Sequence, residues 1–209
     1  MTYTIDVAIN SGCFQNIVVC TDSEKYASIA QRAGAEAPYL RSPENAGDRC
    51  PDILWVNEAV EQLSKLNLKF DAICILRPTS PFRTTSMLKR ALRRFRALEH
   101  IDSLRAVQEC TEHPAKMWRA SNDIMYPLLP YDVNGVPWHS NQKTQLPKIY
   151  IQNASLEIVH KSVILNKSSI SGDVVAPFFT DGYEGYDINS MNDWLLAETL
   201  LAKKTVIIQ

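Results

Sequence analysis

Short apolar runs alternate with longer amphipathic segments along most of this chain. Residues 17–20, 72–76 and 103–107 are apolar runs of strand length. Apolar positions recur at helical spacing over 23–33, from Pro51 to about residue 63, and from about residue 84 to 97. Strands that alternate with helices of this length predict βαβ units, so we expect an α/β fold around a mostly parallel sheet.

The alternation stops between residues 110 and 147. Five prolines fall there among the aromatic residues Trp118, Tyr126, Tyr131 and Trp138. A long surface loop is one interpretation, but four large aromatic side chains in solvent would be costly. We favour an arm that packs on a partner subunit, within a single domain of residues 1–209.

Regular patterns return after this segment. Residues 148–152 and 156–160 have the composition of strands. Ser190 and Asp193 have the spacing of a capping box, and Trp194 begins the apolar face of a terminal helix.

Composition narrows the class of protein. The chain has 209 residues, 45% hydrophobic and 22% charged, with a formal net charge of −1, so it can bury a full core. The charge does not point to nucleic acid, no apolar run reaches the length of a membrane span, and the first twenty residues lack a signal-peptide pattern. Five scattered cysteines, with no Cys-x-x-Cys pair, predict reduced thiols in a cytoplasmic protein.

The sequence ILRPTSPFR, residues 75–83, is the strongest candidate for a site. Its prolines exclude both a helix and a continuing strand, so a stiff loop lies at the carboxyl end of a strand, where open α/β sheets bind ligands. The loop carries four polar side chains: Arg77, Thr79, Ser80 and Arg83. They suit a carboxylate or a phosphate, although a stiff turn that caps the next helix explains them equally well. The loop has no acidic residue, so we expect the partner of Arg77 to be a ligand anion.

Further polar groups are expected at the same edge. Arg41 and Asp48 lie in a segment without a regular pattern. Asp187 and Asn189 are two residues apart in an extended stretch, so their oxygens point the same way and suit a hard cation such as Mg²⁺. We interpret Asp193 as a helix cap and the basic run over 89–96 as a solvated helix face. The four histidines lack metal-ligand spacing.

Several of these segments together resemble one family. ILRPTSPFR resembles the Leu-Gln/Arg-Pro-Thr-Ser-Pro-Leu-Arg signature of the acylneuraminate cytidylyltransferases, the CMP-sialic acid synthetases. TIDVAINSGCFQNIVVCTDS, YLRSPENAGD and YDINSMNDWLLAE are similar to further family segments, in family order over nearly the whole chain. YIQNASLEI departs from the Asn-Gly-Ala-Ile-Tyr of sialic acid enzymes and resembles the branch that activates legionaminic acid and related bacterial nonulosonic acids.

The resemblance implies a three-layer, Rossmann-like nucleotidyltransferase fold and a homodimer formed through residues 110–147. It also implies Mg²⁺-assisted transfer of a cytidylyl group from CTP to a nonulosonic acid, giving the CMP-sugar and pyrophosphate, in bacterial surface polysaccharide biosynthesis. Asp187 and Asn189 take the positions of the metal-binding aspartates, with Asp187 as the catalytic residue. Arg41 and Asp48 fall in the nucleotide segment. The residues implied for the sugar acid are Arg77, Thr79, Ser80, Arg83 and Asn153.

One family segment has no counterpart in this sequence. The family begins with a strand and an Ala-Arg-x-Gly-Ser-Lys loop that holds the CTP phosphates, whereas this sequence starts at the following helix and its seven glycines do not cluster. We therefore expect an N-terminally truncated member with little transferase activity as a 209-residue chain. It is either a fragment or mis-started reading of a longer protein, or a degenerate member. The alternative function is an inactive, dimeric binding protein that keeps the sugar-acid pocket.

Overall fold

The computed structural model describes residues 1–206 and 208, and the chain divides into two compact units. Unit 1 contains Met1–Ala106 and Asn153–Gln209, and unit 2 contains Val107–Gln152. The limits of unit 2 lie close to those of the segment 110–147, where the regular pattern of the sequence stops.

A four-stranded sheet has the strand order β1-β7-β2-β8. Its strands are β1 (Ala72–Ile75), β2 (Ser103–Glu109), β7 (Tyr150–His160) and β8 (Val175–Phe179). β7 runs antiparallel to β1, with Ile75 opposite Glu157, so the sheet is mixed. The predicted α/β fold class is confirmed. The two strands predicted at 148–152 and 156–160 are one strand, and the one predicted at 17–20 forms only parallel bridges, from Val18 to Glu36 and from Thr21 to Leu40.

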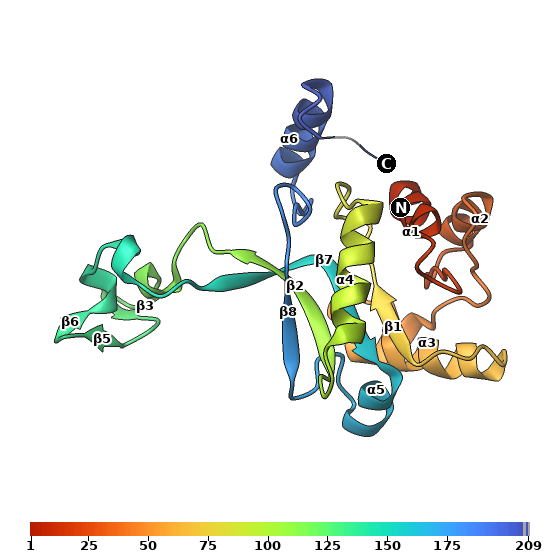
Figure 1. Cartoon of the computed structure of the whole chain (residues 1–209), viewed down its shortest axis with the longest axis horizontal. Coiled ribbons are helices and arrows are strands. Elements are labelled where there is room, and N and C mark those ends of the chain that lie inside the picture. Colours follow the sequence, from red (N-terminus) through yellow and green to blue (C-terminus); the bar gives the residue numbers. More distant parts are fainter. Residues whose placement is uncertain (207, 209) are drawn as a thin grey trace. The chain divides into compact units, whose positions relative to one another are not determined.

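Helices cover both faces of this sheet in unit 1 (Figure 1). α1 (Thr2–Ser11) and α4 (Thr85–Ala97) pack on one face with Leu156 and Ile158 of β7. α3 (Asp52–Lys65) and α5 (Lys161–Lys167) pack on the other face with Val159. Because successive side chains of a strand point to opposite faces, β7 buries apolar groups in both layers. Each such side chain contributes about 1.5–3 kcal/mol when it is fully buried.

The remaining helices of unit 1 pack in two smaller cores. α2 (Glu24–Arg32) contributes Ala30 to a small core with Ile5 of α1. α6 (Met191–Ala202) buries Ala197 and Leu200 against Phe82. A short 3-10 turn, η1 (Pro43–Asn45), lies between α2 and α3.

Side-chain caps begin three of these helices. The hydroxyl of Ser23 accepts from the amide of Tyr26 at the start of α2, and that of Thr84 accepts from the amide of Met87 at the start of α4. Ser190 and Asp193 form the predicted capping box of α6. Asp193 therefore serves the helix, and hydrogen bonds from Ser190 hold the pKa of its carboxyl below the usual value.

Unit 2 contains two hairpins. β3 (Trp118–Ser121) pairs with β4 (Ile124–Pro127), and β5 (Asp132–Val133) pairs with β6 (Val136–Pro137). Asn134 and Gly135 turn the second hairpin with φ of 55° and 75°, so this Asn-Gly pair was the sequence signal that could have predicted it. The 3-10 turns of this unit are η2 (Pro114–Lys116), η3 (Trp138–Ser140) and η4 (Lys143–Gln145).

Two general properties follow from the described residues. None of their helices has both the length and the apolar character needed to cross a membrane. All five cysteines are free thiols.

Candidate active site

Arg83 is the buried centre of the loop 77–83. Its side chain is 1% exposed, and its guanidinium donates to the backbone carbonyls of Arg77 and Ser155 and to Thr4 Oγ1. Burial lowers the pKa of Arg83 to about 10, while the charge of Asp187 acts in the opposite direction. These contacts are to the protein, so Arg83 sets the shape of the loop, and its contact with a sugar acid stays a prediction.

Arg77 forms ion pairs with two carboxylates from distant parts of the chain. Its Nη2 lies 2.5 Å from Asp52 Oδ2 at the start of α3 and 3.3 Å from Glu157 Oε1 on β7. Glu157 is 2% exposed and also lies 3.1 Å from Arg105 Nη2. The premise that Arg77 depends on a ligand anion for its partner is therefore wrong, because carboxylates far away in the sequence reach it.

The cluster of Arg77, Arg105, Asp52 and Glu157 balances two positive charges with two negative ones. Burial by itself would raise the pKa of Asp52, but hydrogen bonds from Arg77 and Trp55 outweigh burial and lower it. Burial would lower the pKa of Arg77, and its two carboxylates raise it instead. A substrate carboxylate would add uncompensated negative charge here, so it would have to use the exposed part of Arg77, whose side chain is 32% exposed.

The segment 186–189 lies against the Pro-Thr-Ser-Pro loop. The amide of Ile188 donates to the carbonyl of Thr79 at 2.9 Å. The rings of Tyr186 and Phe82 pack with centroids 5.3 Å apart. These contacts bring together two segments that the sequence assigned to one site.

Two polar atoms at this junction are buried and lack a hydrogen-bond partner among the described residues. They are the hydroxyl of Ser80, which is 1% exposed, and Oδ1 of Asp187. The other carboxylate oxygen of Asp187 accepts from Asn189 Nδ2 at 2.8 Å. Because an unsatisfied buried polar atom costs free energy, such atoms mark positions that a ligand would satisfy.

Asp187 and Asn189 fit a hard cation as a partial ligand set. The unpartnered Oδ1 of Asp187 is an oxygen donor of the kind that Mg²⁺ prefers, and the side-chain carbonyl of Asn189 can add a neutral one. Within residues 1–206 and 208 there is no group of three or more His, Cys, Asp or Glu side chains placed to hold a metal. Substrate phosphates and water would therefore complete the coordination.

Asn153 lies on β7 and is 9% exposed. Its Nδ2 donates to Thr180 Oγ1 at 3.1 Å, and its Oδ1 accepts from the amide of Ser155 at 3.2 Å. Ser155 Oγ in turn donates to the carbonyl of Glu184 at 2.6 Å. This end of β7 therefore holds the segment that carries Asp187, and contact between Asn153 and a sugar acid stays a prediction.

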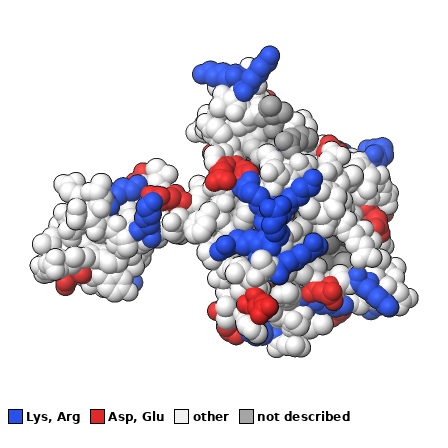
Figure 2. All heavy atoms as spheres, viewed as in Figure 1, with Lys and Arg blue, Asp and Glu red and all other residues white. Residues whose placement is uncertain are grey.

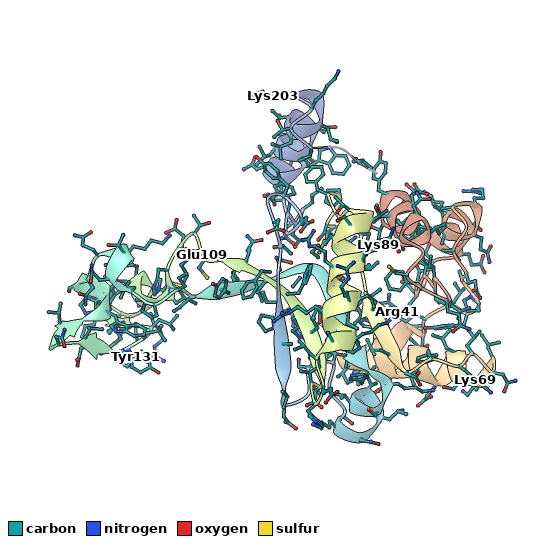
Figure 3. All side chains as sticks on the ribbon, viewed as in Figure 1. Arg41, Lys69, Lys89, Glu109, Tyr131 and Lys203 are labelled. Atoms are coloured by element: carbon teal, nitrogen blue, oxygen red, sulfur yellow. The ribbon has the colours of Figure 1, made fainter. Side chains whose placement is uncertain are left out.

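Arg41 and Asp48 line a cavity of about 1220 Å³ within unit 1, which Arg77 also lines. Arg41 lies on the segment between α2 and α3 (Figure 3). Its Nη2 donates to the carbonyl of Cys20 at 2.6 Å, and its guanidinium lies 5.4 Å from the ring centroid of Trp55. Asp48 is exposed at the same cavity. The predicted nucleotide residues thus share one cavity with Arg77 and Pro78 at the start of the loop 77–83, whereas residues 79–83 do not line it.

Basic side chains gather over α4 on the face shown in Figure 2. Arg90 pairs with Glu184 at 2.8 Å, and Arg94 Nε donates to the carbonyl of Pro177 at 2.8 Å. Lys89, also on this helix, is exposed (Figure 3). The predicted solvated helix face is confirmed, and two of its arginines also hold neighbouring segments.

Three carboxylates that shape this site were not among the predicted residues. Asp52 and Glu157 pair with Arg77, and Glu58 accepts from the amide of Ser42 at 2.8 Å and from Asn45 Nδ2 at 2.7 Å. The sequence signal for Glu157 was a lone charge within an apolar strand, a position that requires a partner. Asp52 and Glu58 lie on a helix, where acidic residues are common, so they carried no comparable signal.

Comparison with known proteins identifies relatives of this chain. A family model described as Cytidylyltransferase matches residues 1–124. The CMP-N,N'-diacetyllegionaminic acid synthase of Legionella pneumophila is 29% identical over 203 residues, which cover 96% of this chain and 84% of that protein. The N-acylneuraminate cytidylyltransferase of Escherichia coli is 27% identical over 204 residues, which cover 98% of this chain and 46% of that protein.

Solved structures show the same fold. A CMP:2-keto-3-deoxy-manno-octonic acid synthetase complexed with CTP matches with a TM-score of 0.62 at 12% identity, covering 96% of this chain and 88% of its own. The 4-diphosphocytidyl-2C-methyl-D-erythritol synthase of Anaerococcus prevotii matches with a TM-score of 0.65 at 12% identity and the same coverage. The expectation of a nucleotidyltransferase fold is therefore confirmed.

The motif resemblance is also confirmed, because the family model and the curated relatives lead to the same group of enzymes. The alternative of an inactive binding protein is not favoured, since both relatives are named for their transfer or synthesis activity. The family model covers more than half of the chain, and the chain belongs to the cytidylyltransferase family.

Proposed function

We propose that this protein transfers a cytidylyl group from CTP to a nonulosonic acid of the sialic type, in bacterial surface polysaccharide biosynthesis. Membership of the family supports CTP as the donor, and the names of the two relatives support an acidic nine-carbon sugar as the acceptor. The observation that carries the proposal is the hydrogen bond from Ile188 to Thr79, which sets Asp187 beside the stiff loop.

The residues of the site divide between the two substrates. Arg41 and Asp48 bind the nucleotide at the cavity that they line. The residues that contact the sugar acid are Arg77, Thr79, Ser80, Arg83 and Asn153. The unpartnered hydroxyl of Ser80 supports this assignment, because a ligand oxygen would satisfy it.

The reaction joins the anomeric oxygen of the acid to the α-phosphorus of CTP. The new O–P bond forms as the bond to pyrophosphate breaks, and the hydroxyl proton is lost to solvent. Asp187 and Asn189 would hold Mg²⁺, which supplies charge neutralisation at the phosphates. Asp187 acts as the catalytic carboxylate, because its Oδ1 keeps no partner in the described part of the protein.

A cytoplasmic homodimer is part of the proposal. Trp118, Tyr126 and Tyr131 in unit 2 are 41%, 46% and 57% exposed, and a second copy would cover such large aromatic groups. Five free thiols favour a reducing compartment.

The test combines ligand binding with detection of the product. CTP and N-acetylneuraminic or legionaminic acid are titrated calorimetrically in the presence of Mg²⁺, and CMP-linked sugar is measured by mass spectrometry at high protein concentration. We expect binding of CTP over UTP, weakened by Arg41→Ala and unchanged by Arg93→Ala on the exposed face of α4. A chain that binds neither CTP nor a nonulosonic acid contradicts the proposal.

A further inference from the structure

Asp52 and Trp55 lie about one turn apart on the same face of α3. The indole Nε1 of Trp55 donates to Oδ1 of Asp52 at 2.8 Å. The other carboxylate oxygen of Asp52, Oδ2, lies 2.5 Å from Nη2 of Arg77. Asp52 therefore uses one oxygen for Trp55 and the other for Arg77, so the indole N–H fixes the carboxylate that holds the arginine.

The ring of Trp55 makes a separate contact. The guanidinium of Arg41 lies 5.4 Å from the ring centroid, within the range of a cation–π interaction. Nη2 of Arg41 donates to the carbonyl of Cys20, whereas its Nε is buried and has no hydrogen-bond partner within residues 1–206 and 208. The carbonyl and the aromatic ring together set the direction of this guanidinium.

Trp55 thus lies between the residues proposed for the two substrates. Arg41 belongs to the nucleotide side and Arg77 to the sugar-acid side, and both line the same cavity as Trp55. Trp55 contacts Arg41 directly and reaches Arg77 through Asp52. A different part of one side chain therefore serves each arginine.

We propose that Trp55 is a positioning residue for both substrates. Its ring orients Arg41 for CTP. Its N–H orients Arg77, through Asp52, for the carboxylate of the sugar acid. This inference rests on the proposed function and gives a role to a residue that the proposed function leaves out. A purely structural tryptophan would contribute its ring to the neighbouring apolar core, and its N–H would not affect ligand binding.

Two substitutions separate the ring from the N–H. Trp55→Phe keeps an aromatic face for Arg41 and removes the donor to Asp52, whereas Trp55→Leu removes both. In calorimetric titrations, Trp55→Phe should weaken binding of the sugar acid by about three- to tenfold, as the loss of one hydrogen bond predicts, and change the affinity for CTP by less than about twofold. Trp55→Leu should also weaken CTP binding, by about two- to fivefold, because it removes the cation–π contact.

A control and a double-mutant cycle test the route of the effect. Trp194→Phe is the matched control, because Trp194 lies on α6 and is 52% exposed, so both affinities should stay unchanged. In an Asp52→Asn background, Trp55→Phe should cause little further loss of affinity for the sugar acid. The reason is that the N–H acts through the carboxylate that this background already lacks.

A measurement without substrate tests the same contacts. The Nε–H signals of the arginines are followed by heteronuclear NMR. We expect Trp55→Phe to shift the signal of Arg77, and Trp55→Leu to shift the signals of both Arg77 and Arg41. The signal of Arg90, which pairs with Glu184, should not move. Failure of the proposed function is seen separately, as a parent protein that binds neither substrate.

Three results would overturn the inference. An equal loss of both affinities in Trp55→Phe, or no change in either, would show that the N–H does not act on the sugar-acid side. Additive losses from Trp55→Phe and Asp52→Asn would show that the N–H does not act through this carboxylate. An unmoved signal of Arg77 in Trp55→Phe would show that the N–H does not set the direction of the arginine.

Discussion

Arg77 and Asp52 meet as an ion pair, with 2.5 Å between Nη2 and Oδ2, although 25 residues separate them in the sequence. Glu157 extends the pair to β7 and to Arg105. The end of β1, the start of α3 and the middle of the sheet are therefore joined by charge as well as by apolar packing. Removal of one carboxylate therefore leaves an arginine whose positive charge is only partly neutralised.

Glu157→Gln should destabilise the protein by about 3 kcal/mol, because Arg77 and Arg105 then share a partly buried site without their common carboxylate. Urea unfolding measures the change. Glu109→Gln is the matched control, since Glu109 is 56% exposed and lies 3.8 Å from Lys148, so its loss should cost less than about 0.5 kcal/mol. Equal effects of the two substitutions would contradict the assigned role of the cluster.

Asp52 should make stability sensitive to acid. Burial would raise its pKa, but hydrogen bonds from Arg77 and Trp55 outweigh burial and lower it in the folded state. A carboxylate of this kind stabilises the fold above its unfolded pKa of about 3.9, and the contribution is lost as the pH falls through the folded pKa. We expect the free-energy difference between the parent protein and Asp52→Asn to be constant above about pH 5 and to shrink below about pH 4. A difference that stays constant down to pH 3 would argue against this linkage.

Glu58 should affect the binding of CTP and not the binding of the sugar acid. It orders the segment that carries Arg41, through hydrogen bonds from Ser42 and Asn45. Glu58→Gln should weaken CTP binding by about three- to tenfold and leave the affinity for the sugar acid unchanged. Calorimetry measures the affinity for CTP and the affinity for the sugar acid separately. Glu61→Gln, at an exposed residue of the same helix, is the control. A parallel loss of both affinities would show a general structural effect instead.

The proposed homodimer should depend on the aromatic surface of unit 2. Tyr131 is 57% exposed, and Tyr131→Lys places a charge on the surface that we expect the partner to cover. Multi-angle light scattering should give twice the chain mass for the parent protein and a shift toward the monomer for the variant. Met191→Lys on α6, at a residue 71% exposed, is the control and should stay dimeric. A monomeric parent protein at high concentration would rule out the dimer.

Many elements of the fold could be predicted because their signals are local. Ser190 and Asp193 form a capping box within one turn, and the apolar spacing over 23–33 and 84–97 gives α2 and α4 almost to their ends. The two prolines of the loop 77–83 fix a stiff turn after β1. The family motifs could also be identified from the sequence, because they are short runs of particular residues in a fixed order.

Contacts across the sheet were decided only by the tertiary structure. No spacing rule links Asp52 or Glu157 to Arg77, so the sequence predicted a ligand anion where the fold supplies two carboxylates. The apolar run 17–20 met the local criteria for a strand, yet it forms only bridges, because a strand depends on the backbone beside it. The sequence determined which residues could form helices, strands and charged contacts. Packing decided which of them meet, since the energies of ion pairs and hydrogen bonds depend on distances in space that separation along the chain does not set.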